Sequence, residues 1–379
     1  MEGYSARDVV IVVPRYKRKL GLFESISVQR LLEVLHDYDI YFVMPNKLVP
    51  DDDVFYRNNG IRYERFDDSF FENKASYTRL CLSTEFYNRF AGYKYMLIHQ
   101  TDAFLFSDCV MEFANMNYDY VGAPISTGLW QEYHVGNGGL SLRKIASCVR
   151  MLEMKEEIYQ QAGTEKSLFF DSYEDYFWGF CGYSPALEFE VPDVETAAFF
   201  SLQDDSLDVY RKVLSKGLPF GIHEFPYNNL TLWRPIIKQI SGIDLPVLLS
   251  KEDAMVAWGL TTGKTYLIWG YGNWGRKLFR LLKSMRISVD AIVDSKGEGA
   301  FENVEECKVF APTEDFIKKS EYIILAYKGD KSRTRDVLRR LEIEENHVLD
   351  IDDLMDLCAQ KMRGKGFEVD MNRVLDVVG

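Results

Sequence analysis

The side chains best placed to do chemistry in this sequence follow an apolar run at residues 98–106, which reads IHQTDAFLF. Gln100, Thr101 and Asp102 come where the run turns polar, and open α/β sheets bind ligands at such carboxyl ends of strands. The carboxylate of Asp102 could hold a divalent ion that bridges a diphosphate. An Asp that only caps the following turn would show the same pattern, so this segment alone leaves both interpretations open.

A glycine-rich stretch, VGNGGLSLRK at residues 135–144, could bring main-chain N–H groups close to a ligand. Gly136, Gly138 and Gly139 lack a Cβ atom, which allows a close approach of the backbone. Asn137 adds a side-chain amide that can bind a hydroxyl group or a phosphate. A tight hairpin turn would explain the same glycines equally well.

Two adjacent acids, Glu174 and Asp175, lie among aromatic residues in the stretch DSYEDYFWGF at residues 171–180. Neighbouring side chains cannot point the same way, so at most one acid faces a reacting hydroxyl while the other braces the backbone. A carboxylate in an aromatic pocket can have a raised pKa and act as a general base. Acids that favour a helix N-terminus through its dipole give the alternative explanation.

His223 follows Gly221 in the stretch PFGIHEF at residues 219–225. An isolated histidine is more often a hydrogen-bonded structural residue than a ligand. From a loop, however, its imidazole could reach a metal ion or a diphosphate held by the earlier segments.

A different pattern, GYGNWG, follows an apolar run at residues 265–269 and precedes a helical pattern. Gly270, Gly272 and Gly275 fit the dinucleotide-binding fingerprint in its strand–turn–helix context, and Asp294 comes 19 residues after Gly275. The helix N-terminus could hold a phosphate, and Asp294 could accept a hydrogen bond from a ribose hydroxyl. Trp274 is bulky for a phosphate loop, so a nucleotide site and a scaffold that packs or dimerises both remain open.

The elements that must position these residues alternate between strands and helices. Apolar runs predict strands at residues 8–13, 40–44, 61–66 and 93–98, and helical patterns occupy residues 25–36, 75–90 and 145–161. Such alternation predicts an α/β fold with a mixed, mainly parallel sheet and helices on both sides. A fresh α/β pattern begins at Gly263, so we expect a domain at 1–245, a linker at 246–262 and a small Rossmann-like domain at 263–379.

Composition narrows the functional classes. The net charge of −13 over 379 residues argues against a nucleic-acid partner, which would select a basic face. The six cysteines are scattered without a CxxC pair, which disfavours a zinc ribbon and favours a reducing compartment. The first residues do not resemble a signal peptide, and no window reaches the ~18 apolar residues of a membrane span. We therefore expect a cytoplasmic protein, acting from the inner membrane face if its substrate is membrane-linked.

The order of several motifs in the first domain resembles a known enzyme group. The motifs are VVIVVPRY, HQTDAFLF, YDYVGAPI, VGNGGLSLRK, EDYFWG, VPDVETAAFFS and PFGIHEF. Together they resemble glycosyltransferases of the GT-A type and, more closely, a bacterial family long labelled as a domain of unknown function and assigned to that fold. The resemblance covers roughly residues 8–226.

The resemblance implies a role for each matching residue on the donor side. Pro14 and Arg15 would lie beside the nucleotide base and ribose. Gln100, Thr101 and Asp102 occupy the place of the Asp-x-Asp metal motif. Because Gln100 replaces the first acid, Asp102 would be the motif's remaining ligand for Mn²⁺ or Mg²⁺.

The remaining matches concern the reacting groups. Gly138 and Gly139 would pass close to the donor sugar or the acceptor. Asp175 matches the catalytic base of inverting members, and His223 matches a histidine that touches the metal or the diphosphate. The implied reaction moves a hexose-type sugar from a nucleoside diphosphate sugar, most commonly a uridine diphosphate sugar in this fold, to a hydroxyl of a glycan, lipid-linked or protein-linked acceptor.

The second domain resembles small Rossmann-type domains fused to polysaccharide-synthesis enzymes. Two other functions remain open: an NAD(P)-dependent oxidoreductase or epimerase built on the C-terminal fingerprint, and a non-catalytic nucleotide-sugar binding protein. The C-terminal domain lacks a full-size six-stranded unit, which disfavours the first, whereas loss of metal binding through Gln100 would favour the second. Peripheral membrane association and homo-oligomerisation are also left open.

Overall fold

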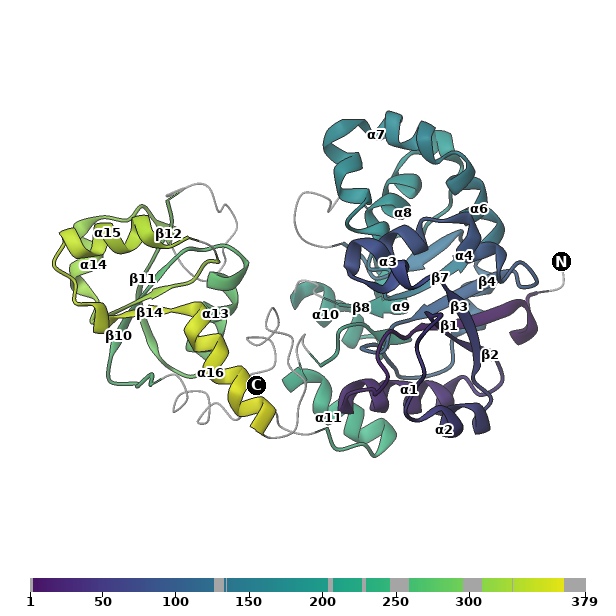
Figure 1. Cartoon of the computed structure of the whole chain (residues 1–379), viewed down its shortest axis with the longest axis horizontal. Helices are drawn as coiled ribbons and strands as arrows, with labels where there is room; N and C mark the ends of the chain where they lie inside the picture. The colour runs from purple at the N-terminus through teal and green to yellow at the C-terminus, as the bar shows by residue number, and fades with distance from the viewer. Residues whose placement is uncertain are drawn as a thin grey trace. The chain divides into compact units, whose positions relative to one another are not determined.

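The computed structural model describes residues 3–125, 133, 135–203, 207–226, 230–245, 259–295, 309–328 and 330–364. The chain falls into two compact units, one drawn from Met1–Asn228 and Ile236–Ile243, the other from Asn229–Pro235 and Asp244–Gly379. Each is an α/β structure in its own right (Figure 1). Of the linker predicted at 246–262, residues 246–258 lie outside the described residues.

The first unit is built on a six-stranded sheet with the order β3-β2-β1-β4-β7-β6. Its strands are β1 (Val9–Pro14), β2 (Asp39–Pro45), β3 (Arg62–Phe66), β4 (Tyr95–His99), β6 (Tyr120–Gly122) and β7 (Leu140–Lys144). The four strands from β3 to β4 run parallel to one another, whereas β7 is antiparallel to both of its neighbours. The sheet is therefore mixed but mainly parallel.

Both faces of this sheet are covered by helices (Figure 1). In β1 all six residues are buried, as expected for a β-branched run in a parallel sheet. Val10 and Val12 pack on the side of α3 (Lys74–Cys81) and α6 (Ile145–Glu153). Alternate residues of the strand, such as Ile11, pack on the side of α1 (Leu22–Val34). One strand thus joins two cores.

The rest of the first unit consists of short helices and a second, small sheet. The sheet has the order β5-β9-β8, formed by β5 (Phe104–Leu105), β8 (Ser201–Leu202) and β9 (Gly221–Ile222). The remaining helices are η1 (Ala6–Asp8), α2 (Asp53–Asn58), η2 (Asp68–Phe71), α4 (Thr84–Asn88), α5 (Val110–Asn115), α7 (Lys155–Phe170), α8 (Glu174–Tyr183), η3 (Pro185–Leu187), α9 (Val194–Phe200) and α10 (Leu207–Leu214).

Two of the helices predicted as single elements are divided. The helical pattern at 75–90 becomes α3 and α4, because the Ser83 hydroxyl accepts a hydrogen bond from the Phe86 N–H at 3.3 Å and starts a new helix. The pattern at 145–161 becomes α6 and α7, and α7 is kinked at Gly163, which has a φ of 75°.

The second unit holds five parallel strands in the order β12-β11-β10-β13-β14. The strands are β10 (Thr265–Trp269), β11 (Ser288–Val293), β12 (Val309–Phe310), β13 (Tyr322–Leu325) and β14 (Val348–Asp350). Its helices are α13 (Asn273–Ser284), α14 (Glu314–Lys319), α15 (Ser332–Arg340), η4 (Glu345–His347) and α16 (Ile351–Gly364). The strand order is that of the first five strands in a doubly wound sheet.

The predicted fold class, α/β with mainly parallel sheets and helices, is confirmed. Helix α11 (Leu230–Ser241) contributes residues to both units. None of the helices in the described part of the chain is both long enough and apolar enough to cross a membrane.

Candidate active site

The carboxyl end of β4 and the glycine-rich turn lie side by side. Because β7 runs antiparallel to β4, the turn that precedes β7 arrives at the edge of the sheet where β4 ends. The N–H of Gln100 donates to the carbonyl of Gly139 at 2.7 Å. Thr101, the next residue, has its hydroxyl 3.5 Å from a carboxylate oxygen of Glu24 on α1. The first two predicted segments therefore meet.

The glycines of this turn are required by close packing on both sides. A Cβ atom added to Gly138 would overlap the Glu174 carboxylate, and one added to Gly139 would overlap the imidazole of His223. A Cβ atom added to Gly136 would overlap the side chain of Ile125. These contacts go beyond the needs of a simple hairpin turn.

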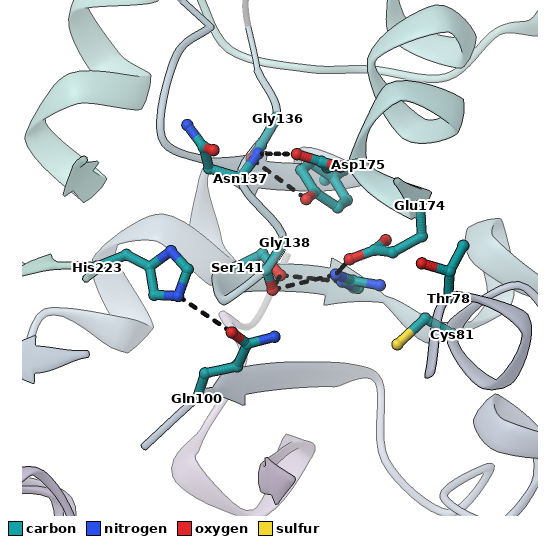
Figure 2. Close-up of polar contacts among 12 residues, drawn as sticks. Thr78, Cys81, Gln100, Gly136, Asn137, Gly138, Ser141, Glu174, Asp175 and His223 are labelled. Carbon is teal, nitrogen blue, oxygen red and sulfur yellow. Dashed lines mark hydrogen bonds and ion pairs between the residues drawn. The ribbon is translucent and has the colours of Figure 1, made fainter. Parts of the chain in front are cut away.

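His223 follows β9 and reaches the end of β4 from the small sheet. Its Nε2 atom lies 3.2 Å from Asp102 Oδ1 and 3.1 Å from Gln100 Oε1, and its Nδ1 atom lies 2.7 Å from Gln203 Oε1. Figure 2 shows the imidazole directed at Gln100 beside the glycine turn. The N–H of Phe225 donates to the carbonyl of Asp102 at 3.1 Å, which ties the two loops together.

Asp102, His223 and Glu224 form a group that could hold a divalent cation. Each offers one ligand atom, and these atoms lie within 4.8 Å of one another. One imidazole and two carboxylates suit Mn²⁺ or Mg²⁺, so the donor set fits the implied metal. Glu224 was not predicted, and its φ of 56° is unusual for a residue with a side chain. The adjacent pair HE in the sequence was the only signal for it.

Gln203 is a second residue that sequence reasoning missed. Histidines that bind metals commonly donate their other ring N–H to a protein oxygen, which fixes the tautomer and the orientation of the ring. The Gln203 amide oxygen occupies that place for His223. A lone glutamine after a short strand carries no signal for this role.

The adjacent acids at the start of α8 point to different partners. Glu174 is buried and lies 2.7 Å from Arg143 Nη2, and burial raises the pKa of its carboxyl while Arg143 opposes that rise. Asp175 is half-buried, and its Oδ2 atom accepts a hydrogen bond from the Asn137 N–H at 3.0 Å. Of the two predicted catalytic acids, only Asp175 faces the glycine turn with partial exposure.

Arg143 on β7 contacts several groups of the site, and the sequence did not indicate this role. Its fully buried guanidinium donates to Ser141 Oγ at 3.0 Å, to the Tyr87 hydroxyl at 2.9 Å and to the carbonyl of Gly138 at 3.2 Å. The guanidinium also packs on the ring of Tyr120, with Arg143 Cζ 5.2 Å from the ring centroid. An arginine between two strand residues, in a strand that also contains Ser141 and Lys144, carried no clear sequence signal for this role.

Pro14 and Arg15 lie at the end of β1, but Arg15 is used differently from the expectation. Its guanidinium is fully buried, lies 2.5 Å from Asp52 and donates to the main-chain carbonyl of Arg18 at 2.6 Å. It also packs on Phe42. Arg15 therefore holds the loop after β1 in place, and a contact of its charge with a nucleotide stays a prediction.

His99, the last residue of β4, is buried beneath this site. Among the described residues, neither of its ring nitrogens has a hydrogen-bond partner. Burial lowers the pKa of its imidazole to about 4; Asp102 acts in the opposite direction, and His223 lowers the pKa further. His99 is consequently neutral near pH 7.

The residues of the C-terminal fingerprint also come together in the second unit. Gly270 has a φ of 103°, and a Cβ added to Gly275 would overlap the carbonyl of Gly270. Gly272 precedes the first turn of α13. The carboxylate of Asp294 accepts a hydrogen bond from the Tyr271 N–H at 2.8 Å, so it braces the loop itself.

Residues 60–223 match a family described as "Protein of unknown function (DUF5672)". No curated protein matches the sequence significantly.

Three solved structures similar to the chain are glycosyltransferases by their descriptions. The apo-form glycosyltransferase GlyE of Streptococcus pneumoniae TIGR4 is 10% identical over 90% of this chain and 90% of its own, with a TM-score of 0.37. The galactosyltransferase LgtC, in complex with donor and acceptor sugar analogs, is 14% identical over 62% and 97%, with a TM-score of 0.39. A glycosyltransferase involved in the glycosylation of the major capsid of PBCV-1 is 14% identical over 57% and 91%, with a TM-score of 0.34. The stretch that matches the family of unknown function contains Gln100, Asp102, the glycine turn, both α8 acids and His223.

Proposed function

We propose that the first unit is a glycosyltransferase that moves a hexose-type sugar from a nucleoside diphosphate sugar to a hydroxyl of a glycan or glycoconjugate. One observation carries the proposal: the turn at 136–139 touches His223, beside Asp102 and Glu224, on one side and Asp175 on the other. A group suited to a metal–diphosphate thus lies one short turn away from a carboxylate suited to proton transfer. Such a pairing suits sugar transfer to a hydroxyl by a single displacement from a metal-bound diphosphate donor.

The donor's leaving group is the chemical reason for the acidic and imidazole ligands. Asp102, His223 and Glu224 would hold a divalent ion, which supplies a positive charge that stabilises the departing diphosphate. The amide oxygen of Gln100 lies 3.1 Å from His223 Nε2. Gln100 stands where the Asp-x-Asp motif that the sequence resembles has its first acid. The main-chain N–H groups of the glycine turn can add hydrogen bonds to the donor.

Asp175 is the proposed general base in a single displacement. Its Oδ2 atom is engaged by the Asn137 N–H, so Oδ1 takes the proton from the acceptor hydroxyl. As that oxygen bonds to the anomeric carbon, the bond from this carbon to the diphosphate breaks, and the nucleoside diphosphate leaves with the electron pair. The product has the inverted anomeric configuration. Glu174 takes no part in proton transfer because it is buried against Arg143.

Donor hydrolysis tests this proposal. Purified protein is incubated with a panel of sugar nucleotides, beginning with uridine diphosphate sugars, with and without Mn²⁺, and released nucleoside diphosphate is measured. We expect slow release from one donor that Mn²⁺ accelerates and that an acceptor accelerates further. Tight binding of a donor without release, with or without acceptors, would instead support a nucleotide-sugar binding protein.

A nucleotide in the second unit is a separate proposal, favoured by the close approach of Gly270 and Gly275 and by the nearby Asp294. Titration with NADH, followed by its fluorescence, tests it. A response to NADH together with no response to any sugar nucleotide would favour an oxidoreductase over the transferase.

A further inference from the structure

A buried ion pair lies directly beneath the glycine turn. The side chain of Arg143 is 0% exposed and that of Glu174 is 10% exposed, and the two charges approach to 2.7 Å. Figure 2 shows Glu174 on one side of Gly138, near Thr78 and Cys81, and shows His223 and Gln100 on the other side. The turn therefore separates the ion pair from the candidate metal ligands.

The ion pair and Ser141 fix the orientation of one peptide group. The carbonyl of Gly138 accepts hydrogen bonds from Ser141 Oγ at 2.8 Å and from Arg143 Nη2 at 3.2 Å. In a trans peptide the carbonyl and the following N–H point in opposite directions. Because the Gly138 carbonyl is held toward Arg143, the N–H of Gly139 is turned away from the ion pair.

Across the turn from the ion pair lies His223, one of the candidate metal ligands. Gly139 packs so closely on His223 and Gln100 that an added Cβ would overlap the imidazole and lie 2.8 Å from Gln100 Oε1. The carbonyl of Gly139 itself accepts from the Gln100 N–H. An N–H beside a cation site can donate to an oxygen of the anion that the cation binds.

We propose that Arg143 and Glu174 are a positioning pair that holds the Gly138–Gly139 peptide so that the Gly139 N–H donates to a phosphate oxygen of the donor diphosphate. This inference rests on the proposed function. Neither charged group touches substrate; both act through the peptide.

The energetics of buried charges support a positioning role over a purely stabilising one. Removing two charges from water costs free energy that their attraction often does not recover, and apolar residues of similar size can replace such pairs without loss of stability. Arg143 uses its remaining donors on Ser141 and Tyr87, which hold the guanidinium in a fixed geometry, whereas Glu174 Oε2 has no hydrogen-bond partner among the described residues. This arrangement fixes the orientation of the Gly138 carbonyl, which accepts hydrogen bonds from Arg143 and Ser141.

The double variant Arg143→Met/Glu174→Leu separates the two roles. It removes both buried charges, so we expect a melting temperature within about 5 °C of the wild type. Binding of Mn²⁺ alone, followed by electron paramagnetic resonance, should be unchanged because Asp102, His223 and Glu224 are intact. Binding of inorganic pyrophosphate at saturating Mn²⁺, followed by calorimetry, should weaken about 10-fold because an oriented hydrogen bond to a charged group is lost.

Equal pyrophosphate binding by the folded double variant and the wild type would overturn the positioning role and leave the proposed function standing. Weakening of Mn²⁺ binding by the same factor would also overturn it, since the pair would then act on the metal ligands. A wild type that binds no pyrophosphate with Mn²⁺ would overturn the proposed function and this inference together.

Ser141→Ala is the second variant, for use if the double variant does not fold. It removes one of the two hydrogen bonds to the Gly138 carbonyl and keeps the ion pair. We expect pyrophosphate binding to weaken about 3-fold or more, with Mn²⁺ binding unchanged. Unchanged pyrophosphate binding in this variant would contradict the inference.

Discussion

Asp175 owes its place to one hydrogen bond and one helix. It lies in the first turn of α8, and its Oδ2 atom accepts from the N–H of Asn137. Its neighbour Glu174 is turned inward to Arg143. The two acids therefore have separate tasks, one at the surface of the turn and one below it.

Replacing the carboxylate of Asp175 tests its role as a base. We expect Asp175→Asn to lower turnover by ~10²–10⁴-fold, because a positioned base contributes that much, while the amide oxygen can still accept from Asn137. Donor affinity, measured by calorimetry, should stay nearly the same.

The matched control is Asp171→Asn, which changes an exposed acid that accepts a hydrogen bond from Tyr159. It should leave turnover unchanged. Loss of donor binding with turnover retained in Asp175→Asn would show that Asp175 holds the donor instead.

His99 gives the first unit a pH dependence. Its pKa falls from an ordinary 6.5 to about 4 in the folded chain, so between these values the unfolded chain binds more protons. The contribution of this shift to the free energy of unfolding is therefore fully present above about pH 6.5. It is lost as the pH falls toward 4, and it amounts to about 3 kcal/mol in total. We expect His99→Leu to flatten this part of the curve in urea unfolding measured from pH 7 to 4.5.

The control for this experiment is His36→Gln, since His36 is exposed at the end of α1. It should keep the wild-type pH dependence. A slope in His99→Leu equal to that of the wild type would rule out His99 as its source.

Among single residues, the sequence predicted those that lie at the end of an apolar run or within a short motif. Asp102 follows an apolar strand, and His223 and the glycines lie in short motifs, so their types and spacing pointed to a common site. Arg143 and Glu174 are 31 residues apart, and no local pattern shows that they pair. Gln203 follows β8 and contacts His223, which follows the neighbouring strand β9, so only the folded chain brings the two residues within reach.

Among the elements, buried strands were the most predictable. The β-branched run of β1 and the apolar run of β10 are buried in the interior of a sheet. Their positions agree with the strands predicted at residues 8–13 and 265–269. Helix ends were less predictable because they depend on single side chains. Ser83 starts α4 within a stretch whose apolar periodicity continues without a break.

The connection from β10 to α13 offers a paired test at a single turn. A methyl group at Gly275 would overlap the Gly270 carbonyl, whereas a methyl group at Gly272 would meet nothing within 4 Å. We expect Gly275→Ala to destabilise the second unit by about 1–3 kcal/mol through overpacking, and Gly272→Ala to have little effect. Thermal unfolding followed by circular dichroism compares the two, and equal behaviour would contradict the packing argument.

For the whole molecule, the two units have cores of their own. The apolar clusters around β1 and β4 belong to the first unit, and a cluster around Leu267 and Leu325 belongs to the second. Each unit should therefore unfold as a cooperative block. The fresh strand–turn–helix pattern after Gly263 is the signal on which the sequence-based domain boundary rests, and no sequence pattern indicated that α11 contributes residues to both units.

Calorimetry tests this division in the intact chain. We expect two unfolding transitions, of which Mn²⁺ with pyrophosphate raises only that of the first unit, since a ligand stabilises the unit that binds it. Gly275→Ala should lower only the other transition. A single transition that moves with either change would show that the units unfold together.

The reversed direction of β7 has a consequence for how such a protein can diversify. Strand β6 ends and β7 begins at the same edge of the sheet, and two described residues of the connection between them, Ile125 and Gly136, pack together beside Asp175. Residues can be inserted or exchanged there while the register of His99 against Leu140 is retained. In the proposed transferase, selection for a new acceptor would then act first on described residues of this connection, at 123–125 and 135, with the donor end of the reaction left as it is.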